Sequence, residues 1–210
     1  MTEVGASAGG VLLAFAAWTL MFRLDRRDIW PRTWIAAAVV GAYSLAAAAA
    51  LGRLHTVLGP VGLTEAGLGA AVGLAYVAVT HLGAAVIRRV TPAFLDQVSD
   101  LYSLSDGVGV ARIAGPLVAM GVAEELLFRG LIQGGIGVAA AIAAYAAVQV
   151  IEWKVALVFA AVLGGVVWGA LFAWTHGLVA PIVAHLAWTT TLLFVWPLRR
   201  GPAPSELGDH

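Results

Sequence analysis

Apolar segments long enough to cross a lipid bilayer recur along this 210-residue chain. A membrane-spanning helix needs about 20 predominantly apolar residues to cross ~30 Å of hydrocarbon. Of all residues, 61% are hydrophobic and only 11% are charged. We therefore predict an all-α fold, a polytopic bundle of seven transmembrane helices that forms a single membrane domain over residues 1–210. The expected spans are residues 6–22, 34–51, 66–87, 109–132, 137–151, 155–175 and 178–196.

Composition excludes several classes of function. The chain has no cysteine, so disulfide bonds, thiolate metal sites and a cysteine nucleophile are ruled out. Its formal net charge is zero. No basic patch with interleaved aromatic residues is present, so nothing in the sequence points to nucleic-acid binding.

Basic residues alternate between the expected loops and so predict an orientation. The second loop contains only Arg53, and the N-terminus and two further loops contain none. Because cytoplasmic loops carry an excess of lysine and arginine, we expect a multi-pass inner-membrane protein with its N-terminus outside and its C-terminus in the cytoplasm. The basic residues expected inside are Arg23, Arg26, Arg27, Arg32, Arg88, Arg89, Lys154, Arg199 and Arg200.

Residues 91–107 differ from the apolar segments around them. Pro92 opens this stretch, and apolar and acidic side chains alternate after it. That spacing suits a short amphipathic helix lying at the cytoplasmic interface, although an ordinary polar loop fits it as well.

Glu124 and Glu125 lie inside the fourth expected span, where a central charge costs about 2.5–3.5 kcal/mol. An intramembrane carboxylate is by default a functional site. On a helix, Glu125 lies four residues before Arg129, a favourable spacing for an ion pair. Glu124 points to a different face of the helix, and the residue four positions after it is Phe128, which cannot form an ion pair. A carboxylate without a local partner in apolar surroundings takes up a proton readily, as a general base must. A purely structural ion cluster remains the alternative.

Two other polar side chains have depths in the membrane similar to that of Glu124. His185 and Gln149 lie on the seventh and fifth expected spans, and all three residues fall roughly 10–20 Å below the same outer face. They could therefore converge in one cavity, and this places Glu124 nearer the periplasmic side. His81, which has no acidic neighbour, is expected to be a packing residue.

The acidic segment resembles a known motif. EELLFRG, residues 124–130, is similar to the EExxxR motif of the CPBP (Abi) family of intramembrane glutamic proteases, which includes CAAX-prenyl endopeptidases and bacteriocin-processing enzymes. THGLVAPIVAH, residues 175–185, is similar to the stretch that leads into the family's HxxxN motif. The resemblance implies a catalytic core over residues 108–197, after the N-terminal spans and interfacial helix of residues 6–107 and before a cytoplasmic tail, 198–210.

The resemblance implies a role for each matching residue. Glu124 corresponds to the carboxylate that activates water, and Glu125 and Arg129 to its supporting pair. His185 corresponds to a histidine that stabilises the oxyanion.

Two positions depart from the family pattern. Members of the family usually also carry an FxxxH motif one span after the acidic pair, and its histidine works with the glutamate on the water. Here this motif best matches residues 145–149, where Gln149 replaces the histidine. A literal match ends at His176, but it lies only nine residues before His185, which leaves no room for the helix between the motifs. Thr189 stands in place of the HxxxN asparagine. Glutamine cannot accept a proton, whereas threonine keeps one donor and one acceptor.

We therefore expect an intramembrane glutamic endopeptidase that hydrolyses a peptide bond of a membrane-associated protein or peptide. Three alternatives remain open. One is an inactive family member that binds a membrane peptide, as an immunity or scaffold protein would. The others are a transporter with a carboxylate proton relay, and a sorting-signal peptidase, which an outward-facing site would favour.

No cofactor or metal is expected. Glu124, Glu125 and His185 superficially suggest zinc, but Arg129 occupies Glu125 and glutamine stands at position 149. Only two good ligands then remain, fewer than a catalytic zinc site needs. The expected partners are the lipid bilayer and a hydrophobic or membrane-anchored protein substrate.

Overall fold

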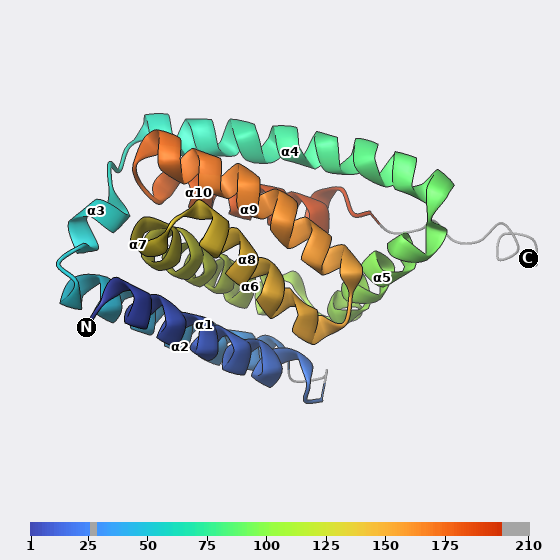
Figure 1. Ribbon diagram of the computed structural model, residues 1–210. Coiled ribbons are helices and arrows are strands. Elements are labelled where there is room, and N and C mark those ends of the chain that lie inside the picture. Colours follow the sequence, from blue (N-terminus) through green and yellow to red (C-terminus); the bar gives the residue numbers. More distant parts are fainter. Residues whose placement is uncertain (26–28, 199–210) are drawn as a thin grey trace, which may run out of the picture.

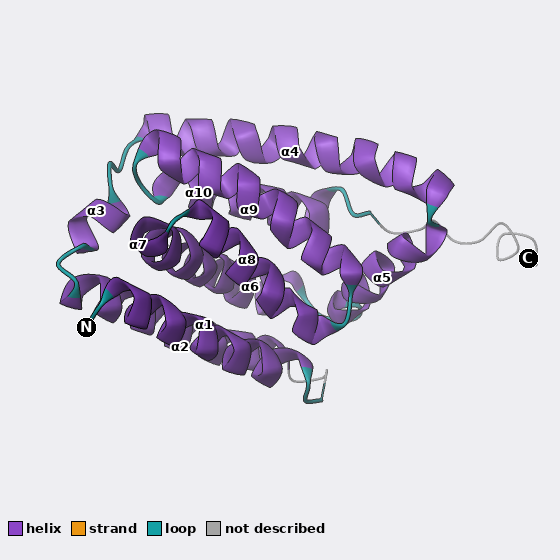
Figure 2. Cartoon of the chain, viewed as in Figure 1, coloured by secondary structure: helices purple, strands orange, loops and turns teal. Residues whose placement is uncertain are grey.

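Helices make up almost all of the computed structural model, which describes residues 1–25 and 29–198 (Figure 2). No β-strand occurs in these two stretches, so the predicted all-α bundle is confirmed. The seven long helices are α1 (Glu3–Phe22), α2 (Ile29–Ala50), α4 (Leu63–Val90), α6 (Val110–Glu125), α8 (Val138–Gln149), α9 (Val155–Thr175) and α10 (Val179–Thr190). The shorter elements are α3 (Leu54–Leu58), α5 (Pro92–Tyr102), α7 (Gly134–Ile136), the 3₁₀ turns η2 (Ser103–Ser105) and η4 (Val150–Glu152), and the π-helices η3 (Leu126–Gln133) and η5 (Thr191–Val195).

Each predicted span coincides with one long helix, but the helices differ in how well they suit a membrane. Four of the described helices, α1, α2, α4 and α9, are long and apolar enough to cross it. The other three long helices, α6, α8 and α10, are shorter, with 16, 12 and 12 residues. The number of seven crossings therefore stays a prediction.

The helices are arranged in layers (Figure 1). Helix α4 runs along one side of the molecule and packs against α10, while α1 and α2 lie together on the opposite side. Helices α6, α8 and α9 fill the space between them, with α2 packed on α6 and α8 packed on α9. The acidic pair at the end of α6 therefore lies in the interior of the bundle.

Small residues allow α4 and α10 to pack backbone against backbone. Gly69 and Gly73 on α4 face Ala180 and Ala184 on α10, and a Cβ at either glycine would overlap the facing backbone. Close approach of this kind is typical of helix pairs that pack in lipid. Because His185 directly follows Ala184, this contact also fixes the position of His185.

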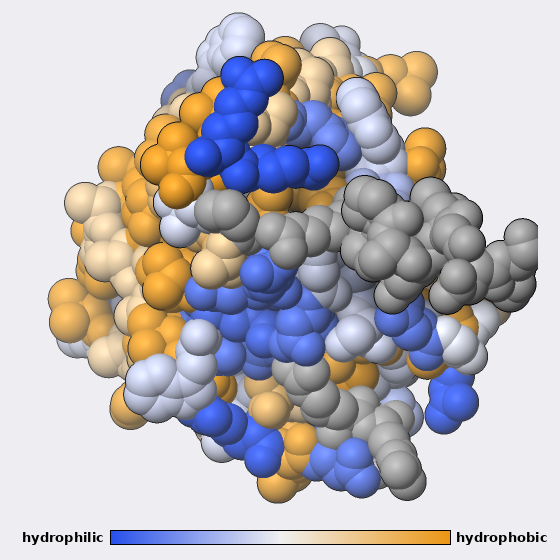
Figure 3. Space-filling model, turned by 90° about the vertical axis from the view of Figure 1, so that its right-hand side faces the viewer, coloured by the Kyte–Doolittle hydropathy of each residue, from blue (hydrophilic) through white to orange (hydrophobic). Residues whose placement is uncertain are grey.

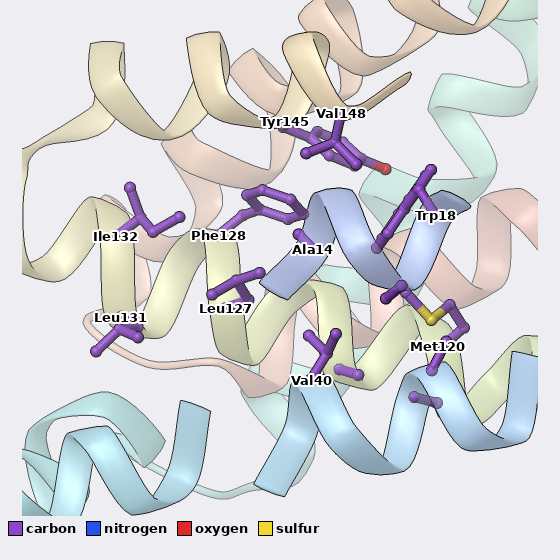
Figure 4. Packing of buried hydrophobic residues seen from close by; sticks show 14 of the residues in the cluster. Ala14, Trp18, Val40, Met120, Leu127, Phe128, Leu131, Ile132, Tyr145 and Val148 are labelled. Carbon is purple, nitrogen blue, oxygen red and sulfur yellow. The ribbon is translucent and has the colours of Figure 1, made fainter. Parts of the chain in front are cut away.

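The π-helix η3 lies at the centre of the main hydrophobic cluster (Figure 4). Phe128 is fully buried and meets the edge of the Trp18 ring from α1, with the ring centroids 6.4 Å apart. On its other side it packs against Tyr145 from α8, at 4.7 Å. Phe128 therefore holds η3 between α1 and α8, and Arg129, the next residue, is held with it.

Helix α5 lies at one end of the bundle (Figure 1). The stretch predicted as an amphipathic helix or a polar loop is helical over Pro92–Tyr102, so the loop alternative is wrong. Its Leu95 and Tyr102 are buried against the bundle. The Tyr102 hydroxyl donates to the Leu192 carbonyl at 2.8 Å and accepts from the Leu198 amide at 3.1 Å. The apolar face of α5 therefore packs on protein.

The same end of the molecule carries the basic loops. Figure 3 views this end, where hydrophilic residues gather across the middle and hydrophobic residues lie along the edges. Lys154 forms an ion pair with Asp100 of α5. The described residues do not include Arg26, Arg27, Arg199 or Arg200. Of the predicted tail 198–210, they include only Leu198.

Candidate active site

Glu125 and Arg129 form the predicted ion pair. Arg129 Nε donates to Glu125 Oε2 at 3.3 Å, and both residues are fully buried. The pair survives although the helix widens from α to π geometry directly after Glu125. Two opposite charges can be buried together in an apolar interior because each neutralises the other. Removal of either partner would leave an uncompensated charge.

Helix α9 provides further support for η3. Arg129 Nη1 donates to the Gly165 carbonyl at 3.3 Å, and Gln133 Nε2 donates to the Gly169 carbonyl at 2.9 Å. Both donors come from η3, and both acceptors are glycine carbonyls one helical turn apart on α9. Because glycine has no side chain, η3 can approach α9 closely enough for these bonds. Arg129 is therefore held through two nitrogens of its guanidinium group, one bonded to Glu125 and one to α9.

His185 binds the second oxygen of Glu125. Its Nδ1 lies 2.9 Å from Glu125 Oε1, and its ring stacks on buried Trp168 with centroids 5.7 Å apart and planes 15° apart. Nε2, at the opposite side of the ring, lies 3.9 Å from Glu124 Oε2. Glu125 is thus a bridge between Arg129 and His185, whereas the sequence suggested only the bond to Arg129.

Glu124 points away from Glu125, as predicted, but it has a partner that the sequence analysis did not identify. The Tyr145 hydroxyl donates to Glu124 Oε2 at 2.7 Å. Tyr145 lies on α8, four residues before Gln149, at the position of the family's phenylalanine. The signal that could have revealed it was this extra hydroxyl at a position where the family pattern has an aromatic ring alone.

One large cavity contains the predicted catalytic residues. Its volume is about 710 Å³, and its lining is mostly apolar. Glu124, Gln149, His185 and Thr189 all line it, together with Tyr145. The three residues expected to converge from their depths on separate helices, Glu124, Gln149 and His185, therefore do so, and Thr189 lies in the same cavity. Their chemical roles stay a prediction.

The histidines assigned to other roles lie elsewhere. His176 ends α9 in a left-handed conformation, with φ of 53°, and is exposed in the loop before α10. It does not line the cavity. This agrees with matching the second motif to residues 145–149. His81 bonds to the Trp196 carbonyl at 3.1 Å and stacks on the Trp196 ring, as a packing histidine would.

The hydroxyl of Thr189 has an unusual environment. Thr190 follows the common pattern for a helical threonine, because its hydroxyl donates to the carbonyl of Leu186 one turn earlier. Thr189 Oγ1 is buried and has no hydrogen-bond partner in residues 1–25 and 29–198. Because Thr189 is part of the cavity wall, this unpaired hydroxyl lies next to the cavity.

The cavity extends toward the end of the bundle that carries the basic loops. Its lining continues from Glu124 to Phe22 at the end of α1, Trp30 at the start of α2, and Leu101 and Tyr102 on α5. From its depth on the helix, Glu124 was expected nearer the opposite face, with an outward-facing site as one alternative. The depth of a residue along its helix does not determine the side on which a cavity opens, so the membrane side that this cavity faces stays a prediction.

Comparison with models of known protein families gives a match. Residues 107–191 match the family model of type II CAAX prenyl endopeptidases of the Rce1-like kind. This segment contains Glu124, Glu125, Arg129, Gln149, His185 and Thr189. Comparison with curated proteins and with solved structures gave no match. The resemblance based on two motifs is therefore confirmed, and residues 107–191 are similar to Rce1-like CAAX prenyl endopeptidases of the CPBP family, which indicates a membrane-embedded protease.

Proposed function

We propose that this protein is an intramembrane glutamic endopeptidase in which Glu124 activates water. The observation that carries the proposal is the different environment of the two adjacent carboxylates. Glu125 is fully buried between Arg129 and His185. Glu124 lines the cavity, and 12% of its side chain remains exposed there. Only Glu124 is therefore accessible to both water and substrate.

The charges around Glu124 favour this role. With His185 protonated, Glu124 and Glu125 are balanced by Arg129 and His185, so the buried cluster is neutral overall. Burial of charges is tolerated when they are paired in this way. The 3.9 Å between Glu124 Oε2 and His185 Nε2 is too long for a direct hydrogen bond. A water molecule held between the His185 ring and the carboxylate of Glu124, at about 2.8 Å from each, would bond to both groups.

The reaction then proceeds in two steps. Glu124 removes a proton from this water while the water oxygen attacks the carbonyl carbon of the scissile peptide bond. As the tetrahedral intermediate collapses, the bond between carbon and nitrogen breaks and Glu124 returns the proton to the leaving amine. Donors aimed at the developing oxyanion supply much of the rate enhancement in such reactions. His185 Nε2–H, the Gln149 amide and the Thr189 hydroxyl are the donors that line the cavity.

The substrate is an apolar or lipid-bearing segment of a membrane-associated protein, of the CAAX kind. The cavity volume of about 710 Å³ is within the range of small-molecule sites, and its mostly apolar wall suits a hydrocarbon chain. If the basic loops face the cytoplasm, as the positive-inside rule predicts, the cavity is entered from the cytoplasmic side. This direction favours a CAAX-like substrate over a sorting signal on the outer surface.

The test is cleavage of defined peptides by the purified protein in liposomes. The panel contains a prenylated CAAX peptide, the same peptide without its lipid, and a peptide with a transmembrane anchor. Wild type is expected to cleave the prenylated peptide fastest, and Glu124→Gln is expected to cleave none. Glu65→Gln, the same change at the start of α4 and away from the cavity, should match wild type. Failure of wild type to cleave any peptide would favour the inactive, peptide-binding alternative.

A further inference from the structure

Helix α8 presents two polar side chains to the cavity, one turn apart. Tyr145 and Gln149 are four residues apart, so they lie on the same face of the helix. Both line the cavity that contains Glu124. Gln149 can hold a water but cannot take up a proton. The side chain on α8 that contacts Glu124 directly is Tyr145, through its hydroxyl.

The surroundings of Tyr145 fix the direction of this hydroxyl. Its ring packs on Phe128, with centroids 4.7 Å apart, and the guanidinium carbon of Arg129 lies 5.5 Å from the ring centroid. Only 7% of the residue is exposed. Phe128 and Arg129 both belong to η3, which is bonded to α9. The ring therefore has little freedom, and the hydroxyl is aimed at Glu124 before any substrate binds.

The hydrogen bond from Tyr145 involves one carboxylate oxygen of Glu124, Oε2, and does not involve the other, Oε1. The hydroxyl donates to Oε2 at 2.7 Å, a length typical of a strong hydrogen bond between a hydroxyl and a carboxylate. Oε2 also faces His185 Nε2 at 3.9 Å. The structure gives Glu124 Oε1 no hydrogen-bond partner within the described part of the chain. The two oxygens of Glu124 therefore have different environments.

We propose that Tyr145 is a positioning residue for the peptidase reaction, because it fixes Glu124 through Oε2 and leaves Oε1 to receive the proton of the attacking water. This inference rests on the proposed function, since it assigns Tyr145 a role through Glu124. Helix α8 then contributes to the reaction through Tyr145, which lies one turn before Gln149, the glutamine that replaces the family's histidine.

The first test compares two tyrosine hydroxyls that make hydrogen bonds of nearly equal length. Tyr145→Phe removes the bond to Glu124. Tyr43→Phe removes a bond of 2.8 Å from Tyr43 to the Ala6 carbonyl, which joins α2 to α1 outside the cavity. Tyr145→Phe is expected to lower kcat about 10- to 100-fold, the usual effect of losing a hydrogen bond to a charged group. KM should stay near that of wild type, and Tyr43→Phe should leave both constants near the wild-type values.

The second test keeps the hydroxyl and does not depend on turnover. Replacement of Tyr145 by 3-fluorotyrosine should retain the activity that Tyr145→Phe loses. The ¹⁹F resonance of this probe should move when Glu124→Gln replaces the carboxylate acceptor by an amide. It should not move with the matched change Glu65→Gln.

Each outcome decides between the two proposals. Activity in Glu124→Gln would overturn the proposed function. An inactive Glu124→Gln together with a fully active Tyr145→Phe would overturn only the role of Tyr145. An equal loss of kcat in Tyr43→Phe, or a ¹⁹F resonance that ignores Glu124→Gln, would also overturn it.

Discussion

The carboxylate of Glu125 and the imidazole of His185 lie 2.9 Å apart, although 60 residues separate them in the chain. This bond joins the two sequence motifs, because Glu125 also binds Arg129 of its own motif. The ring of His185 stacks on Trp168, and its Nδ1 bonds to Glu125. One carboxylate of the acidic pair therefore orients the histidine, which leaves the other free for chemistry.

Replacement of Glu125 should destabilise the bundle more than replacement of an exposed glutamate. Glu125→Gln leaves the buried charge of Arg129 without its partner, at an expected cost of about 3–5 kcal/mol in the free energy of unfolding. Glu3→Gln is the matched control, because Glu3 pairs with Arg53 nearer the surface, and exposed pairs contribute about 0–1 kcal/mol. Both losses are measured by unfolding each variant in mixed micelles that contain an increasing fraction of a denaturing detergent. Equal losses would show that the buried pair is not a structural anchor.

Two glycines on the same helix should respond oppositely to the same change. A Cβ at Gly73 would overlap the backbone of Ala184, next to His185, whereas a Cβ at Gly83 would meet no atom within 4 Å. Gly73→Ala is expected to cost about 1–3 kcal/mol through overpacking. Gly83→Ala should gain about 0.5–1 kcal/mol, because alanine is the better helix former. Thermal unfolding in detergent measures the difference, and similar melting temperatures for the two variants would contradict the packing of α4 on α10.

Restoration of the family histidine should increase peptidase activity. Gln149→His places a group that accepts and donates protons on the wall of the cavity that Glu124 also lines. We expect a higher kcat from this variant. His176→Ala should leave the rate unchanged, since His176 lies exposed in the loop between α9 and α10. A loss of activity in His176→Ala, with none in Gln149→Ala, would mean that the motifs were matched in the wrong register.

The orientation can be tested because the chain has no cysteine. Val61, before α4, and Thr91, after it, are both exposed and lie at opposite ends of that helix. A single cysteine at position 61 should react with an impermeant reagent added to intact cells, and one at position 91 should react only after lysis. The opposite pattern would turn the cavity toward the outer surface and favour a sorting-signal peptidase.

Local patterns predicted much of this molecule. The ion pair of Glu125 and Arg129 follows from a spacing of four residues, which keeps two side chains on one face of a helix. The alternating apolar and acidic side chains after residue 91 allowed a helix or a polar loop, and only the structure decided for the helix over residues 92–102. The long apolar segments identified all seven long helices, because burial in lipid or protein requires such segments.

The features that the sequence did not reveal depend on how separate helices meet. The bond from Tyr145 to Glu124 requires α8 to face α6, and that contact is set by the packing of Phe128 between Trp18 and Tyr145. The extent of the cavity depends on α5, because Leu101 and Tyr102 line it at the end of the bundle that carries the basic loops. Spacing along one helix contains no information about either.

The central claim is that Glu124 activates the water that cleaves the substrate. Its most direct test is the initial rate of cleavage by Glu124→Gln, measured against wild type in the same liposomes, with the melting temperatures of both proteins recorded. A positioned general base contributes about 10²- to 10⁴-fold to a rate. We therefore predict a fall of at least about 100-fold with an unchanged melting temperature. A rate equal to that of wild type in a folded Glu124→Gln protein would contradict the account.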